Sequence, residues 1–219
     1  MKENSNISNI TIIGNTTWGQ AIATLINKEK AGVQILCRTE LEAKNRINKL
    51  DKLKSLPSTI QLSSDISTIG DSELIILAFP SQSMRSNLNI INNNLNQNHK
   101  FLIASKGIEK TSGKRLSEVL TEEITFIKEK NISILSGPNL AKEIYENKST
   151  STVIASKNFS LLKNIKSIIE SNKFKIYLSD DTIGVELGGA LKNIVTLGAG
   201  ICDGLNIGNN LKGAFISIA

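Results

Sequence analysis

The chain is poor in the residues that build disulfide frameworks, metal sites and catalytic triads. Among its 219 residues are two cysteines, Cys37 and Cys202, which lie far apart. This spacing implies no disulfide framework and is typical of a reducing compartment, so we expect a cytoplasmic protein. The one histidine, His99, lies in a polar segment. A histidine-based metal site or triad is therefore disfavoured, and no metal is expected.

Long apolar runs and blocks of basic residues are also missing. No uninterrupted apolar run reaches the roughly 18 residues of a membrane span, and residues 1–8 lack the apolar centre of a signal peptide. Lys and Arg number 26 against 20 Asp and Glu, which gives a net charge of +6. Because this surplus is spread along the chain, it favours small anionic ligands over nucleic acid, which needs a clustered basic patch. We therefore expect no nucleic-acid partner and no membrane span.

Short β-branched and leucine-rich runs alternate with helical stretches over most of the chain. Apolar residues make up 40% of the chain and aromatic residues only 4%, so Ile and Leu supply most of the core, as in a sheet covered by helices. We expect strands over residues 9–13, 33–37, 72–79, 100–105, 131–135, 151–156 and 173–178, and helices over 20–27 and 160–170. This rhythm predicts an α/β fold with a doubly wound, Rossmann-type sheet.

A glycine turn follows the first expected strand. Gly14 ends the strand and Gly19 lies at the start of the helical stretch. A strand, a tight turn and a helix in this order aim backbone N–H groups at a pyrophosphate. The usual fingerprint has a third glycine between these two, and here Thr16 takes its place, so a simple strand–turn–helix stays open as an alternative. Because a β-branched residue crowds a pyrophosphate, we expect Thr16→Gly to tighten binding.

Arg38 follows the second expected strand, where a dinucleotide fold contacts the ribose. An arginine there suits a 2′-phosphate, whereas an acidic residue suits a free hydroxyl, and no acid stands at this strand end. Pro80, Lys106 and Gly137 also follow strands, so all four residues should meet at one edge of the sheet. The position of Arg38 favours NADP(H) over NAD(H), and a solvated surface arginine is the alternative.

Two adjacent glycines, Gly188 and Gly189, interrupt an expected helix over residues 184–194. Each costs a helix interior about 1 kcal/mol relative to alanine. A chain tolerates that cost where another backbone or a ligand must come close. Lys192 follows one turn later, and a lysine beside such a surface is a candidate acid/base for a hydroxyl or carbonyl. A packed helix with a solvated lysine stays open as the alternative.

Six motifs occur in order along nearly the whole chain. They occupy residues 14–21, 78–81, 104–109, 136–143, 184–194 and 202–210, and they include a Trp-Gly pair, a Ser-Gly-Pro segment and the sequence Gly-Gly-Ala-Leu-Lys-Asn. Together they resemble the motifs of the NAD(P)-dependent glycerol-3-phosphate dehydrogenases of bacterial type. The resemblance implies NAD(P)H-dependent reduction of dihydroxyacetone phosphate to sn-glycerol 3-phosphate, a step of phospholipid synthesis, with NADPH as the favoured cofactor.

The resemblance also implies roles for individual residues. Lys192 would exchange a proton with the C2 oxygen of the substrate, and Lys106 would hold that oxygen. Implied cofactor contacts come from Gly14, Thr17, Trp18, Gly19, Arg38, Pro80, Lys106 and Ala141, and implied substrate contacts from Lys106, Gly137, Asn139, Lys192 and Asn193. Two alternatives remain: a related Rossmann dehydrogenase acting on another hydroxy acid, and a non-catalytic or decayed remnant that binds a dinucleotide.

The strand pattern stops after Asp181, and the sequence becomes helical and rich in Gly and Ala. We place a dinucleotide-binding domain at 1–181 and the first part of a helical substrate domain at 182–219. The resemblance implies further segments that hold the substrate phosphate, so we expect little activity from residues 1–219 alone. A fragment, a shortened gene product and a decayed copy all stay open. We also expect exposed apolar side chains in the helical part that favour a homodimer; they are Ile194, Leu197, Ile201, Leu205, Phe215 and Ile218.

Overall fold

A computed structural model describes residues 7–49, 51 and 56–218 of the chain. Its centre is an eight-stranded sheet with the order β3-β2-β1-β4-β5-β6-β7-β8. The strands are β1 (Asn9–Ile13), β2 (Gly32–Leu36), β3 (Ile60–Ser63), β4 (Leu74–Leu77), β5 (Lys100–Ile103), β6 (Ile132–Ser136), β7 (Thr150–Ala155) and β8 (Phe174–Ser179). Strands β1 to β6 are mutually parallel, whereas β7 is antiparallel to β6 and parallel to β8.

The strand order reverses between β1 and β4, because the chain first winds outward from β1 to β3 and then crosses back to β4. The order 3-2-1-4-5-6 is that of the Rossmann fold, in which ligands bind in the crevice outside the carboxyl ends of the strands at this reversal. The expected doubly wound α/β fold is therefore confirmed, with two oppositely directed strands added beyond β6.

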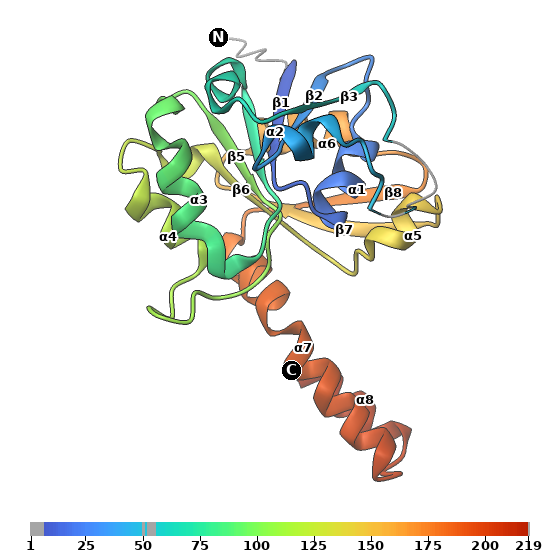
Figure 1. Ribbon diagram of the computed structural model, residues 1–219. Coiled ribbons are helices and arrows are strands. Elements are labelled where there is room, and N and C mark those ends of the chain that lie inside the picture. The colour runs from blue at the N-terminus through green and yellow to red at the C-terminus, as the bar shows by residue number, and fades with distance from the viewer. Residues whose placement is uncertain (1–6, 50, 52–55, 219) are drawn as a thin grey trace.

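Helices cover both faces of the sheet (Figure 1). They are α1 (Thr17–Leu25), α2 (Glu40–Lys44), α3 (Met84–Ile91), α4 (Leu116–Glu123), α5 (Ala141–Tyr145) and α6 (Phe159–Ile169). On one face, α1 and α6 pack against alternate strand residues such as Ile12 and Ile76. On the other face, α3 and α4 pack against the intervening residues, including Ile75 and Phe101. Strands buried on both faces explain the near-continuous apolar runs in the sequence.

All seven expected strands are present, with ends that differ by at most two residues, and the helices expected over 20–27 and 160–170 correspond to α1 and α6. Strand β3 was not predicted. Its four residues, Ile-Gln-Leu-Ser, contain two apolar side chains only, and they lie at the edge of the sheet beside β2. Such a short half-polar run carries too little periodicity to be recognised.

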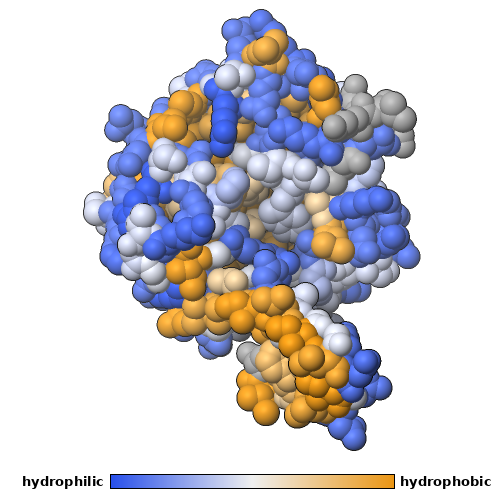
Figure 2. Space-filling view, turned by 60° about the horizontal axis from the view of Figure 1, so that its bottom comes forward, coloured by the Kyte–Doolittle hydropathy of each residue, from blue (hydrophilic) through white to orange (hydrophobic). Residues whose placement is uncertain are grey.

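Two further helices, α7 (Thr182–Gly204) and α8 (Asn209–Ile218), project from the sheet domain, and α8 packs back along α7 (Figure 1). Asp181 is the N-cap of α7, since its carboxylate accepts the N–H of Gly184 at 2.8 Å. Figure 2 shows apolar side chains gathered along these helices. Of the six apolar residues expected to be exposed, five are, whereas Phe215 is partly covered because its ring lies against Gly198 of α7.

By length and composition alone, α7 could cross a membrane, because it has 23 residues and its most apolar 18-residue window has a mean hydropathy of 1.2. One such helix is weak evidence for a span. The helix carries Glu186, which is buried against α4 at Ser117, and Lys192, which lines a cavity of the sheet domain. These contacts are typical of a helix that packs on a folded domain.

Candidate functional site

Two cavities lie at the carboxyl edge of the sheet, one on each side of the glycine turn. The first has a volume of about 490 Å³ and extends from the turn to Lys106 and Lys192. The second has a volume of about 610 Å³ and extends from the turn to Arg38. Both are lined by Thr16, Thr17, Phe79 and Pro80. An elongated ligand can therefore occupy both cavities by passing over the start of α1.

The glycine turn needs its two glycines for close backbone packing. Gly14 has a φ of +114°, and a Cβ atom there would lie 2.6 Å from the carbonyl oxygen of Ala78 at the end of β4. A Cβ atom on Gly19 would collide with the carbonyl oxygen of Gly14. The two glycines thus let α1 start directly above the junction of β1 and β4. Gly14 lines the second cavity, whereas Gly19 is buried beneath the turn.

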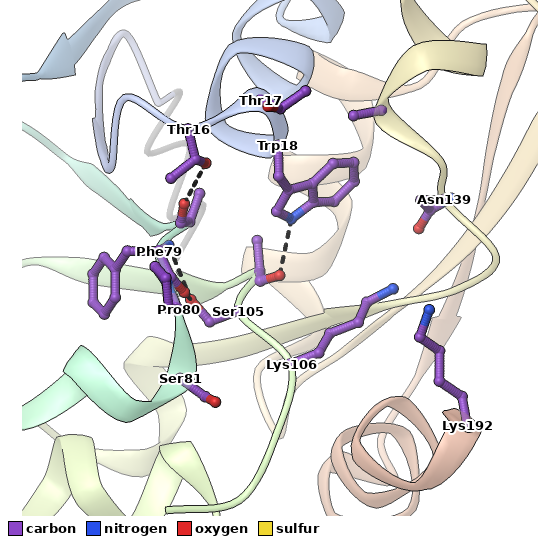
Figure 3. A pocket seen from close by; sticks show the side chains of 13 residues that line it. Thr16, Thr17, Trp18, Phe79, Pro80, Ser81, Ser105, Lys106, Asn139 and Lys192 are labelled. Carbon is purple, nitrogen blue, oxygen red and sulfur yellow. Dashed lines mark hydrogen bonds between the residues drawn. The ribbon is translucent and has the colours of Figure 1, made fainter. Parts of the chain in front are cut away.

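Thr16 occupies the place of the missing glycine because it caps α1. Its Oγ1 accepts the N–H of Gly19 at 2.9 Å and donates to the carbonyl oxygen of Ala78 at 2.8 Å (Figure 3). Its φ of −100° is an extended conformation that any residue adopts. The N–H groups of Thr17 and Trp18, at the first helical positions, have no acceptor within the helix and suit an anion.

Trp18 forms the wall between the hydrophobic core and the first cavity. Its indole N–H donates to the carbonyl oxygen of Ala104 at 2.9 Å, and its ring packs against the core beneath α1 (Figure 3). Ala104 directly follows β5 and lies two residues before Lys106. Trp18 therefore fixes the start of α1 relative to the lysine segment, in addition to lining the cavity.

Lys106 is half-buried just past the end of β5. Its ammonium donates to the carbonyl oxygen of Gly137 at 2.7 Å. Burial, and secondarily the charge of Lys192, lower the pKa of Lys106 to about 8. Figure 3 shows the ammonium ends of Lys106 and Lys192 pointing toward one another across the cavity. With no acidic side chain among the described lining residues of this cavity, its two lysines favour an anionic ligand.

Helix α7 can bring Lys192 to this cavity because Gly189 lies against the end of β6. A Cβ atom on Gly189 would approach the hydroxyl oxygen of Ser136 to 2.5 Å and Cγ of Lys106 to 3.8 Å. By contrast, nothing in the described structure lies within 4 Å of a Cβ atom on Gly188. The expected close approach of another segment is therefore confirmed for Gly189, whereas Gly188 faces open space among the described residues.

Asn139 offers a hydrogen-bond acceptor to the first cavity. Its Nδ2 donates to the carbonyl oxygen of Ser151 at 3.0 Å, which orients the amide. Its Oδ1 is buried and has no partner among the described residues, so a ligand hydroxyl could donate to it. Ala141, the first residue of α5, also lines this cavity. Gly137 is not among the described lining residues of this cavity, and a Cβ atom there would lie 2.9 Å from Cα of Thr152.

The expected site residues do not all reach a cavity. Pro80 lines both cavities, and Arg38 is an exposed wall of the second. Asn193 is exposed on α7 and is not among the described lining residues of either cavity. Contrary to expectation, an acidic side chain also lies beside Arg38. Glu42, one turn into α2, lines the second cavity and accepts the N–H of Arg38 at 3.0 Å.

Glu42 and Glu186 were not predicted as site residues. Glu42 lies outside the six motifs, whereas Glu186 lies in the motif over residues 184–194 but its partner Ser117 does not. For Glu42 a signal was available. Thr39 caps α2 and accepts the N–H of Glu42 at 3.1 Å, which places this carboxylate over the end of β2. For Glu186 no signal existed, because its partner Ser117 is 69 positions away in the sequence.

The fold and the site define the class of protein. A sheet in Rossmann order, with a glycine turn under a helix N-terminus at the strand reversal, is a dinucleotide-binding domain. Residues 9–162 match the family model described as NAD-dependent glycerol-3-phosphate dehydrogenase N-terminus, and residues 181–219 match the corresponding C-terminus model. The chain belongs to the NAD-dependent glycerol-3-phosphate dehydrogenase family.

Individual relatives agree with this assignment. Over 96% of its length, the chain is 39% identical to a glycerol-3-phosphate dehydrogenase [NAD(P)+] of Dehalococcoides mccartyi, and it covers 61% of that protein. The structure of a Plasmodium falciparum glycerol-3-phosphate dehydrogenase superposes with a TM-score of 0.84 at 30% identity, covering 97% of this chain and 63% of the other. For the Coxiella burnetii glycerol-3-phosphate dehydrogenase the TM-score is 0.80 at 26% identity, covering 96% and 66%.

Proposed function

We propose that the chain takes part in the NAD(P)H-dependent reduction of dihydroxyacetone phosphate to sn-glycerol 3-phosphate, a reaction that supplies phospholipid synthesis. The observation that carries the proposal is the convergence of Lys106 and Lys192 on one cavity, beside the N-terminus of α1. The relatives named glycerol-3-phosphate dehydrogenase [NAD(P)+] support the same reaction.

The two cavities fit a dinucleotide that lies across the glycine turn. A Cβ atom at Gly14 would collide with the carbonyl oxygen of Ala78, so this glycine lets the turn between the two cavities lie directly against the end of β4. The pyrophosphate of the dinucleotide would bind the N–H groups of Thr17 and Trp18. Its adenosine half would lie by Arg38, and its nicotinamide half would lie by Pro80 and Ala141. When bound, NADPH or NADH supplies the hydride.

The two lysines would bind and protonate the C2 oxygen of the substrate. Lys106 would hold the C2 oxygen of dihydroxyacetone phosphate, because its ammonium is already fixed by Gly137. Lys192 would deliver the proton to the same oxygen from the facing helix. The free Oδ1 of Asn139 would accept a hydrogen bond from the substrate's hydroxyl group. The positive charge of both lysines would also attract the phosphate.

We also propose a domain boundary, a cellular location and an oligomeric state for the chain. A boundary at 181/182 separates a dinucleotide-binding domain from the start of a helical domain, and it is supported by the N-cap at Asp181 and by the two family models. A cytoplasmic location suits the free Cys37 and Cys202. A homodimer is supported by the exposed apolar face of α7 and α8.

The test measures cofactor binding and turnover separately. NADPH fluorescence is titrated with the purified chain. Loss of NADPH absorbance is then followed with dihydroxyacetone phosphate, for the chain and for a fusion that adds the C-terminal third of the Dehalococcoides mccartyi relative. Lys192→Ala should cut turnover roughly 10²–10⁴-fold and leave NADPH affinity unchanged. Lys142→Ala, at an exposed position on α5, is the matched control.

Each outcome bears on a different part of the proposal. Failure of the chain to bind NADPH or NADH contradicts all of it. Cofactor binding without any turnover of dihydroxyacetone phosphate, even in the fusion, contradicts the assigned reaction and favours a dinucleotide-binding protein that acts on another substrate or on none. Normal turnover in Lys192→Ala contradicts the role of Lys192.

A further inference from the structure

The second cavity holds a charged group that its expected role does not require. Arg38 provides the cation that suits a 2′-phosphate, yet the carboxylate of Glu42 lines the same cavity, and so does the ammonium of Lys49. The described lining of this cavity therefore carries two positive charges and one negative charge, all near the end of β2.

Glu42 is held at the strand end by three donors. Its Oε2 accepts the backbone N–H of Arg38 at 3.0 Å, and its Oε1 accepts Nδ2 of Asn15 at 3.1 Å and Nζ of Lys49 at 3.3 Å. Burial raises the pKa of Glu42, but the hydrogen bond from Arg38 and the contacts with Lys49 and Asn15 outweigh it and hold this pKa below its usual range. The carboxylate is thus a fixed negative charge where a ribose is contacted.

Lys49 is fixed to the same place from a different segment of the chain. Its backbone N–H donates to Oε1 of Gln20 at 2.7 Å, and Gln20 is fully buried in α1. Its ammonium donates to the carbonyl oxygen of Asn15 and to Glu42. The glycine turn and the loop after α2 are therefore joined by Lys49, whose charge stands over the second cavity.

We propose that the Glu42–Lys49 ion pair sets the preference of this chain between NADP(H) and NAD(H). Glu42 opposes a 2′-phosphate beside Arg38, and Lys49 offsets that charge and gives the phosphate a second cation. This inference rests on the proposed binding of a dinucleotide. It assigns the choice of cofactor to three side chains instead of to Arg38 alone.

The physical basis is the electrostatic interaction of a 2′-phosphate with Glu42 and with Lys49. A 2′-phosphate adds negative charge close to the carboxylate of Glu42, and like charges repel over a few ångströms in a partly buried cavity. A free 2′-hydroxyl can donate to the same carboxylate without that penalty. Lys49 acts in the opposite direction, because an ammonium attracts phosphate and neutralises Glu42. Removing either charge should therefore shift preference in a known direction.

The experiment uses the adenosine halves of the two cofactors as probes. Isothermal titration of the intact chain compares 2′,5′-ADP with 5′-AMP, which differ by the 2′-phosphate alone. Glu42→Gln should raise the affinity ratio of 2′,5′-ADP to 5′-AMP about tenfold, and Lys49→Gln should lower it about tenfold. The double variant should lie between them. The matched control is the exposed Glu40–Lys44 pair of the same helix, changed to Glu40→Gln and Lys44→Gln, which should leave the ratio unaltered.

Either of two results would contradict the inference, and the two have different consequences for the proposed function. If 2′,5′-ADP and 5′-AMP bind but the Glu42 and Lys49 variants keep the parent ratio, the ion pair does not set the preference, and the proposed dinucleotide site stands. If neither probe nor either complete cofactor binds the parent chain, the inference fails together with the proposed function. The double variant also covers the case in which a single change disturbs the loop.

Discussion

The carboxylate of Glu186 accepts both the backbone N–H of Ser117 at 2.9 Å and its hydroxyl at 2.6 Å. Arg115 adds a further contact at 3.3 Å. Ser117 lies in the first turn of α4, where a negative charge meets the positive end of the helix dipole. Glu186 is buried, so this contact anchors α7 on the sheet domain six residues before Lys192.

The first prediction concerns this anchor. Glu186→Ala should lower the free energy of unfolding by about 2 kcal/mol, because it leaves two half-buried donors of Ser117 without their partner. It should also speed proteolysis within α7 and lower the turnover of the fusion, while NADPH affinity stays constant. Urea denaturation and limited proteolysis measure the first two effects. Asp203→Asn, which weakens an exposed ion pair with Lys212 at the far end of α7, is the control. Equal effects in both variants would show that Glu186 has no special role.

The second prediction separates the two adjacent glycines of α7. Gly188→Ala should stabilise the chain by up to about 1 kcal/mol, since alanine is the better helix former and the position is open. Gly189→Ala should lose this gain, because its Cβ atom would crowd the hydroxyl of Ser136. Adding Ser136→Ala to Gly189→Ala should restore the gain by removing that oxygen. Thermal and urea unfolding of the four proteins test this, and equal stabilities for Gly188→Ala and Gly189→Ala would contradict it.

Much of the fold could be predicted because the strands are buried on both faces. Residues 74–77, for example, are all fully buried, and only a run of Leu and Ile suits such a strand. The edge strand β3 lacked this pattern and was missed. Two glycines were informative, because Gly14 and Gly189 each lie where two segments of the chain pack closely together.

The sequence predicted which strand ends meet at the site, but not the contacts that join its segments. Strand ends placed Arg38, Pro80 and Lys106 at one edge, as the parallel topology requires. Contacts between segments distant in the sequence, such as that of Glu186 with Ser117, have no local pattern. The cap formed by Thr16 was not predicted for a related reason, since it depends on the carbonyl of Ala78, 62 positions away.

The third prediction follows from the cap at Thr16. Thr16→Gly should lower the free energy of unfolding by about 1 kcal/mol, through loss of the hydrogen bonds to Gly19 and Ala78. It should nevertheless tighten NADPH binding, because the β-branched side chain no longer crowds the pyrophosphate. Thr16→Ser keeps both hydrogen bonds and should match the parent in stability. Urea denaturation and NADPH fluorescence titration measure the two effects. Weaker NADPH binding in Thr16→Gly would mean that the cap orders the turn more than the side chain crowds it.

The last prediction concerns the stability of the chain at high pH. Burial, and secondarily the charge of Lys192, lower the pKa of Lys106 from 10.5 to about 8 in the folded chain. Between these values the unfolded chain binds the proton and the folded chain does not, so the contribution of this group to stability rises with pH across the window. Below about pH 8 the folded chain bears the full cost of a desolvated charge.

Lys106→Met removes that charge and should therefore be more stable than the parent chain at pH 7, with an advantage that shrinks as the pH rises from 8 toward 10.5. Urea denaturation of both proteins at pH 7, 8.5 and 10 measures the difference. Because Lys28 also has a pKa lowered to about 8 by burial, the parent alone would show two overlapping effects, and the difference between the proteins isolates Lys106. A difference that stays constant with pH would mean that Lys106 keeps its ordinary affinity for the proton in the folded chain. In that case water reaches the ammonium of Lys106 in the cavity, and its hydrogen bond to the carbonyl of Gly137 offsets the cost of burial.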